Sequence, residues 1–135
     1  DASRHKFPMI RTLIALAAGS SLLGDGINPA RLLDCIRQVE GHKWTDAGGA
    51  YCIQPTTWRQ HSKLPFAYAS TKAHADHVAE LHLTWLARQL RAEDYPVTPY
   101  TLATCWRFGY EGYKRRRAVS DYATRVSNLY HEKKN

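Results

Sequence analysis

The stretch LLDCIRQVEGHKWTDAGGAYCIQPTTW, residues 32–58, decides the fold of this chain. Its first part, up to Glu40, has apolar residues at helical spacing, which predicts a helix with one buried face. Gly41 follows at once and is a typical residue for ending a helix. Two more glycines come before residue 50. Glu40 is therefore predicted to end a helix and to lie against a glycine-rich loop.

The start of this helix and the segment after the loop also have local signals. Asn28 is a preferred N-cap residue and Pro29 suits the first helical position, so we expect the helix over residues 29–40. Small and larger apolar residues alternate over residues 50–53, which makes this segment the only strand candidate. The predicted fold class is mainly α, with at most a short hairpin after this helix.

Helical signals recur through the rest of the chain. We expect N-caps at Ser70, Thr98 and Ser120, and a turn bracketed by Gly109 and Gly112. The further helices that these signals predict cover residues 8–23, 55–58, 71–91, 99–108 and 121–132.

Length and composition indicate one domain. The 135 residues are 44% hydrophobic and 23% charged, which is ordinary for a domain with a real core. We divide the chain into an N-terminal segment, residues 1–27, and a main domain, residues 28–135. Within the first, residues 9–23 (MIRTLIALAAGSSLL) are similar to a short signal peptide but too short to span a bilayer. A first core helix is preferred over a retained signal, and no membrane span is expected.

The chain is basic, with a net charge of +7 and a pI of about 9.5. This charge suits an anionic partner: a cell-wall glycan, a nucleic acid or a membrane surface. The basic run from Lys114 to Arg117 has three interpretations, namely phosphate contacts, a solvated loop, or a cationic rim against an anionic cell wall. No recognisable DNA-binding motif accompanies the run, so nucleic acid is the disfavoured partner. We expect a monomer.

Neither the cysteines nor the histidines have the spacing of a metal site. The three cysteines are Cys35, Cys52 and Cys105. They form no CxxC pair, and three reduced, partly buried thiols are preferred over one bridge between the last two. His74, His77 and His82 have no Cys or acidic residue spaced to complete a closed site, and no HExxH occurs. We expect these histidines on a solvated helix face, and no metal or cofactor.

The position of Glu40 suggests its chemistry. The helix dipole and apolar neighbours such as Trp44 both disfavour a charged carboxylate there. A carboxylic acid that keeps its proton can donate it to a glycosidic oxygen. The alternative is that Glu40 is simply solvated, as most glutamates at helix ends are. Asp46, six residues on, is a second candidate carboxylate: a nucleophile ~5 Å away or a more distant base. The preferred interpretation of Asp46 is a turn residue that bonds to its own backbone.

Three segments in order carry a resemblance to a known family. Residues 40–58, with the pattern ExxxxxDAGGAYCIQPTTW, are similar to the lysozyme-like superfamily of lytic transglycosylases, goose-type and invertebrate-type lysozymes and their phage relatives. TLATCWRFGYEGY, residues 101–113, resembles their segment of helix, aromatic, Asn, small residue and Gly. SDYATRVSNLY, residues 120–130, resembles their closing helix. The resemblance spans about residues 30–131.

The resemblance implies a single-domain lysozyme-like fold and a peptidoglycan-cleaving glycosidase that is secreted, periplasmic or phage-associated. Its substrate would be the glycan strand, cut at the β-1,4 bond between N-acetylmuramic acid and N-acetylglucosamine, with Glu40 as general acid and base. Asp46 is the nearest second carboxylate. The residues that would line the cleft are Tyr51, Cys52, Gln54, Trp106, Arg107 and Tyr110.

Two positions depart from the family pattern. Cys52 stands where relatives have Gln, and Arg107 stands where they have Asn. Arg107 can still donate to a glycan carbonyl or to a muropeptide carboxylate, and Gln54 can supply the amide lost at Cys52. Two alternatives to the enzyme therefore stay open: a glycan-binding or structural protein without turnover, and a basic helical nucleic-acid-binding domain.

Overall fold

The computed structural model describes residue 23 and residues 26–132, which form five α-helices and two short 3-10 turns. The elements are α2 (Pro29–Glu40), η1 (Gly49–Tyr51), α3 (Pro55–His61), η2 (Phe66–Ser70), α4 (Lys72–Ala92), α5 (Pro99–Arg115) and α6 (Asp121–Glu132). The described residues include no strand, and the predicted mainly α fold is confirmed. The helix expected over 8–23 lies outside them, except for the buried Leu23.

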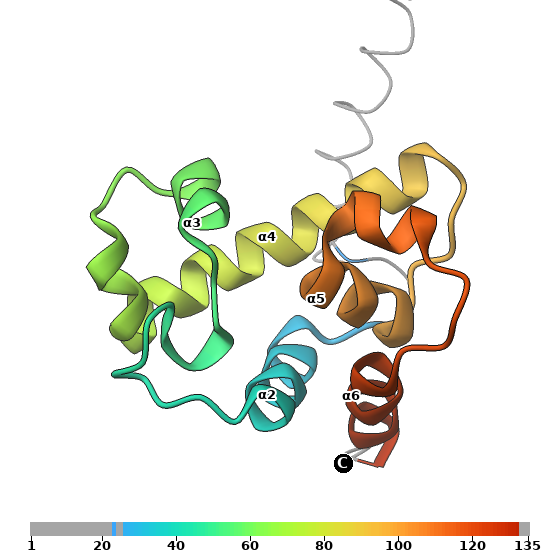
Figure 1. The fold of residues 1–135 in the computed structure, drawn as a ribbon, viewed down its shortest axis with the longest axis horizontal. Helices are drawn as coiled ribbons and strands as arrows, with labels where there is room; N and C mark the ends of the chain where they lie inside the picture. The colour runs from blue at the N-terminus through green and yellow to red at the C-terminus, as the bar shows by residue number, and fades with distance from the viewer. Residues whose placement is uncertain (1–22, 24–25, 133–135) are drawn as a thin grey trace, which may run out of the picture.

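The longest helix, α4, connects two groups of elements (Figure 1). α3, η1 and η2 pack against its first part, and α5 packs against its C-terminal part. α6 contacts both α5 and α2, while α2 also contacts η1 and α4. α2 therefore contacts elements of both groups. None of the described helices is long and apolar enough to cross a membrane.

One continuous core fixes this arrangement. Trp58 of α3 is fully buried, and its indole N–H donates to the carbonyl of Leu64 over 2.7 Å, which satisfies its one polar atom. Each long helix contributes at least one side chain that water does not reach, including Ile36, Leu83, Leu86, Leu102 and Val126. Burial of side chains of this size stabilises the fold by about 1.5–3 kcal/mol each.

The predicted helix starts are confirmed at three places. The side-chain oxygen of Asn28 accepts from the backbone N–H of Arg31 at 3.0 Å, with Pro29 in the first turn. Thr98 forms a capping box at the start of α5. The hydroxyl of Ser120 accepts from the backbone N–H of Ala123 at 3.1 Å. These caps satisfy N–H groups that the helices leave without a partner.

Two helix limits differ from the prediction. The residue before α4 is Thr71 rather than Ser70, because Ser70 belongs to η2. The predicted helix end at residue 108 coincides with a break in α5, but helical turns resume after the break and α5 runs on to Arg115. Gly109 takes φ 79° and ψ 163° inside it, so the chain bends there and then resumes helical turns. The glycine signal was therefore a kink within a helix, and the basic run begins in the last turn of α5.

The strand expected over residues 50–53 is not formed. Gly48, Gly49 and Cys52 have φ angles of 81°, 70° and 54°, which are left-handed and incompatible with an extended strand. The N–H of Cys52 donates to the carbonyl of Gly49, and that of Ile53 donates to the carbonyl of Gly48. The alternation of apolar residues thus reflects a tight turn with Tyr51 and Ile53 buried.

The three histidines of α4 do not share a solvated face. His77 is exposed, but His82 is half-buried, stacked on Trp85 with ring centres 5.7 Å apart, and hydrogen-bonded to His61 at 3.0 Å. Burial, and then the nearby charge of His61, lower the pKa of His82 to about 4, against 6.5 for a free histidine. The interpretation as a solvated face was wrong for His82.

The lowered pKa of His82 predicts a loss of stability in weak acid. Between about pH 6.5 and 4, His82 is protonated in the unfolded chain but not in the folded chain. The contribution of neutral His82 to the free energy of unfolding is therefore fully present above pH 6.5 and decreases as the pH falls through this window. The loss should reach about 3 kcal/mol at pH 4. Urea unfolding at pH 7.5 and 4.5 should show this fall for the wild type and a smaller one for His82→Gln. His77→Gln, at an exposed site on the same helix, should behave as the wild type, and equal falls in all three proteins would contradict the assignment.

Candidate active site

Glu40 is the last residue of α2, and its side chain is only 5% exposed. Gly41 takes the left-handed φ of 69° that ends the helix, and its N–H donates to the carbonyl of Arg37. One carboxyl oxygen of Glu40, Oε2, accepts the hydroxyl of Tyr122 at 2.8 Å. Because Tyr122 lies on α6, two elements far apart in sequence hold this carboxyl group in place.

Tyr122 also links the carboxyl group to α5. Burial, and then the charge of Glu40, raise the pKa of the Tyr122 hydroxyl, so it keeps its proton and remains a donor. The guanidinium carbon of Arg107 lies 5.5 Å from the centre of the Tyr122 ring, within the range of a cation–π contact. Arg107 is exposed, so its positive charge lies at the solvent-facing side of this site.

His42 lies between the two candidate carboxylates. Its Nε2 is 3.7 Å from Oε1 of Glu40, and its Nδ1 is 3.6 Å from Oδ2 of Asp46. Asp46 is 45% exposed, and its Oδ2 accepts from the backbone N–H of Lys43 at 2.8 Å. The structure thus has the bond to its own turn that the preferred interpretation of Asp46 predicted, and it adds His42 between Asp46 and Glu40. Sequence reasoning missed His42, although it lies two residues after one carboxylate and four before the other.

Cys52 is brought to the same place by the turn after η1. Its sulfur, one carboxyl oxygen of Glu40 and one ring nitrogen of His42 all lie within 4.8 Å of one another. Burial, and then the charges of Glu40 and Asp46, raise the pKa of the thiol, which Arg107 partly offsets. The structure has no disulfide between Cys52 and Cys105, and Cys105 is buried.

The aromatic residues near Glu40 are mainly packing residues. Tyr51 is 1% exposed, with Trp44 and Trp106 against its ring at centre distances of 5.8 and 6.2 Å. The indole N–H of Trp106 donates to the carbonyl of Tyr51 at 3.3 Å. Trp44 and Trp106 are half-buried, so these two, rather than Tyr51, offer ring surface to a ligand.

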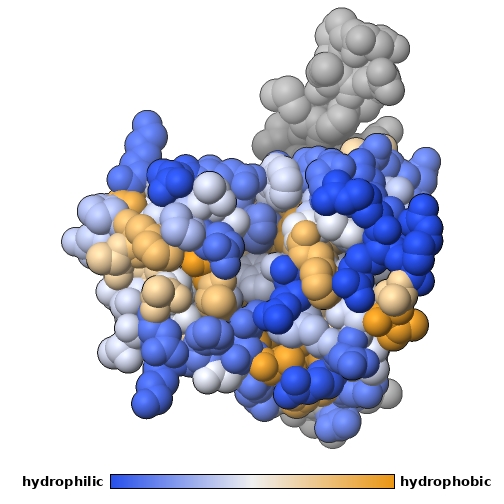
Figure 2. Space-filling view, in the orientation of Figure 1, coloured by the Kyte–Doolittle hydropathy of each residue, from blue (hydrophilic) through white to orange (hydrophobic). Residues whose placement is uncertain are grey.

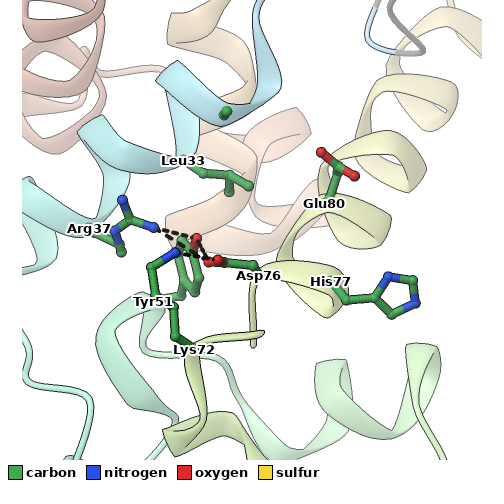
Figure 3. A pocket seen from close by; sticks show the side chains of 8 residues that line it. Leu33, Arg37, Tyr51, Lys72, Asp76, His77 and Glu80 are labelled. Atoms are coloured by element: carbon green, nitrogen blue, oxygen red, sulfur yellow. Dashed lines mark hydrogen bonds and ion pairs between the residues drawn. The ribbon is translucent and has the colours of Figure 1, made fainter. Parts of the chain in front are cut away.

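The hydroxyl of Tyr51 points into a separate polar pocket of about 310 Å³ (Figure 3). There it bonds to the carboxylate of Asp76 and accepts from Arg37 at 2.8 Å. Asp76 also pairs with Lys72 at 2.6 Å, and Arg37 pairs with Asp34 at 2.9 Å. This network connects α2, η1 and α4, and its charges largely neutralise one another. The sequence prediction of a sugar-facing Tyr51 did not include this network.

Two further predicted cleft residues have other surroundings. The hydroxyl of Tyr110 lies 3.1 Å from the carbonyl of Gln89 and bonds to the carboxylate of Glu93, so it is engaged with the end of α4. Gln54 is exposed before the first turn of α3, where its backbone carbonyl accepts from Trp58. Of the predicted site residues, the structure brings Glu40, Asp46, Cys52 and Arg107 close together. Tyr110 is not part of this group.

The basic run forms an edge of the molecule. Figure 2 shows strongly hydrophilic side chains gathered where α5 ends. Lys114 is paired with Glu93 at 3.1 Å, and the guanidinium carbon of Arg116 lies 4.0 Å from the centre of the Phe108 ring. Arg115 and Arg117 are exposed. Positive charge therefore reaches solvent on the same helix that supplies Arg107.

Comparison with known proteins gives no relative from which a role can be transferred. The chain matches no protein-family model, no curated protein and no solved structure. The candidate site therefore depends on its own geometry.

Proposed function

We propose that this protein cleaves peptidoglycan at the β-1,4 bond between N-acetylmuramic acid and N-acetylglucosamine. The main support is the carboxyl group of Glu40, which ends α2, is almost removed from water, and is held through one oxygen by Tyr122. Proton donation to a leaving oxygen requires a carboxylic acid that is held in a fixed orientation and shielded from solvent. The resemblance of residues 30–131 to the lysozyme-like superfamily supports the same assignment.

The proposed reaction uses the oxygen of Glu40 that Tyr122 does not hold. In its acid form Glu40 gives a proton to the glycosidic oxygen as the bond to the anomeric carbon breaks. The resulting carboxylate then removes a proton from water, or from the 6-hydroxyl of the muramyl residue, as that oxygen attacks the anomeric carbon. Glu40 is protonated again at the end of this step, so the cycle needs no further reactant.

Neighbouring residues have supporting roles in this proposal. The positive charge developing at the anomeric carbon is stabilised by an anion or by the substrate's own acetamido group, and Asp46, which lies 3.6 Å from His42 and is 45% exposed, is the candidate anion. Arg107 contacts the glycan or the carboxylates of its peptide stem. In this proposal the exposed Arg115 and Arg117 hold the protein on an anionic cell wall, and the protein acts in a secreted, periplasmic or phage-associated setting.

Purified peptidoglycan tests this proposal directly. Incubation with the wild-type protein should release soluble disaccharide peptides, and mass spectrometry will identify them as hydrolysed or 1,6-anhydro products. Binding to sacculi without release would instead favour the glycan-binding protein without turnover. Tight, strongly salt-dependent binding to duplex DNA, with neither release nor glycan binding, would favour the nucleic-acid-binding domain.

A further inference from the structure

Three side chains of different chemistry converge beside the end of α2. They are the carboxylate of Glu40, the imidazole of His42 and the thiol of Cys52, whose ligand atoms all lie within 4.8 Å of one another. Oxygen, nitrogen and sulfur donors of these residue types are the protein ligands of Zn²⁺. In sequence the three positions match no metal motif, because a helix end and the turn after η1 bring them together.

The distances are close to those of a tetrahedral site. Bonds of about 2.0–2.3 Å from a tetrahedral metal ion separate two ligand atoms by roughly 3.3–3.8 Å. Oε1 of Glu40 and Nε2 of His42 are already 3.7 Å apart. The sulfur of Cys52 lies within 4.8 Å of one carboxyl oxygen of Glu40 and of one ring nitrogen of His42, so a side-chain adjustment of about 1 Å completes a three-ligand site.

Two of the three ligands have the outer partners that orient metal ligands. The other ring nitrogen of His42, Nδ1, faces the Asp46 carboxylate at 3.6 Å, and that carboxylate is fixed by the N–H of Lys43. A carboxylate behind a ligating histidine selects the tautomer whose Nε2 is free to bind metal. On Glu40, Tyr122 occupies Oε2 and leaves Oε1 toward His42.

We propose that Glu40, His42 and Cys52 form a binding site for a divalent transition-metal ion, in the first place Zn²⁺, with water as the fourth ligand. A carboxylate, a thiolate and a neutral imidazole balance the charge of the ion. The sulfur ligand favours Zn²⁺ or Co²⁺ over Mg²⁺ and Ca²⁺, which bind oxygen. Three protein ligands and one open position are typical of zinc sites that exchange a ligand.

Metal binding has a consequence for the proposed cleavage, and this part of the inference rests on the proposed function. Oε1 of Glu40 cannot hold a metal ion and donate a proton at the same time. Zn²⁺ should therefore inhibit release of muropeptides, and a chelator should restore it. The binding itself needs no catalysis and is measured separately.

Cobalt provides a spectroscopic test that is specific for the thiol ligand. Co²⁺ added to the reduced, chelator-stripped full chain should give a near-ultraviolet thiolate-to-cobalt absorption band that saturates at one equivalent and that Zn²⁺ abolishes. Cys52→Ser should remove the band, and His42→Ala should weaken binding at least as strongly as Asp46→Asn, for which we expect about 10- to 100-fold. His77→Ala, an exposed histidine on α4, is the matched control and should bind as the wild type.

Three outcomes would contradict the proposed metal site. Absence of the band in the wild type, a band that persists in Cys52→Ser, or equal weakening by His77→Ala would each exclude it. His42 is exposed in a loop, so its replacement tests the site even if Cys52→Ser fails to fold, which circular dichroism will show. A protein that gives the band but never releases muropeptides keeps the metal site and loses only the proposed function.

Discussion

Replacing Glu40 by glutamine is expected to lower the rate of muropeptide release by about 10²- to 10⁴-fold. Glutamine has nearly the same shape but has no proton to give to the glycosidic oxygen and cannot act as a base afterward. Its amide carbonyl can still accept the hydroxyl of Tyr122, so the position of the side chain is retained. Because this hydrogen bond is kept, the free energy of unfolding should fall by no more than about 1 kcal/mol.

Glu132→Gln is the matched control for this change. Glu132 also ends a helix, α6, but is exposed and contacts none of the residues around Glu40 that the proposal uses. Initial rates on purified sacculi, with equal circular dichroism spectra for all three proteins, should separate the two variants. If Glu40→Gln releases muropeptides at the wild-type rate, Glu40 is not the acid.

Helix starts were predictable because their causes are local. Asn28 and Pro29 act within one turn of α2, and Thr98 does the same for α5. At Gly109 the same reasoning found the break, where φ is 79° and ψ is 163°, but it did not predict the helical turns that resume after it and extend α5 to Arg115. It also failed over residues 50–53, because alternating apolar residues occur in a tight turn as well as in a strand.

The sequence predicted the local setting of Glu40 but not its long-range partners. Glu40 was identified from a helix end followed by glycines, which is a local pattern. Its partner Tyr122 is 82 residues away, and no local signal pairs the two. The family resemblance implied that Tyr51 and Tyr110 line the cleft, but their hydroxyl groups are engaged by Asp76 and Glu93. Long-range polar partners decide which aromatic side chains remain free for a ligand.

Gly49 is expected to be the glycine most sensitive to substitution. A Cβ atom at this position would lie 1.9 Å from the carbonyl oxygen and 2.9 Å from the carbonyl carbon of Ala69, both of which are backbone atoms. The φ of +70° adds a cost of about 1–2 kcal/mol for any side chain. Because the backbone of η2 would have to move, Gly49→Ala should lower the free energy of unfolding by more than about 4 kcal/mol, or prevent folding.

Gly41→Ala separates the steric contact from the backbone strain. Gly41 has nearly the same φ, +69°, but a Cβ there would meet nothing within 4 Å, so only the cost of about 1–2 kcal/mol should remain. The difference between the two variants in the free energy of unfolding, measured with urea, gives the cost of the steric contact between η1 and η2. Equal losses would mean that this contact does not determine the position of η1. A larger loss for Gly49→Ala would show that the close approach of these two turns stabilises the fold around the segment that carries Cys52.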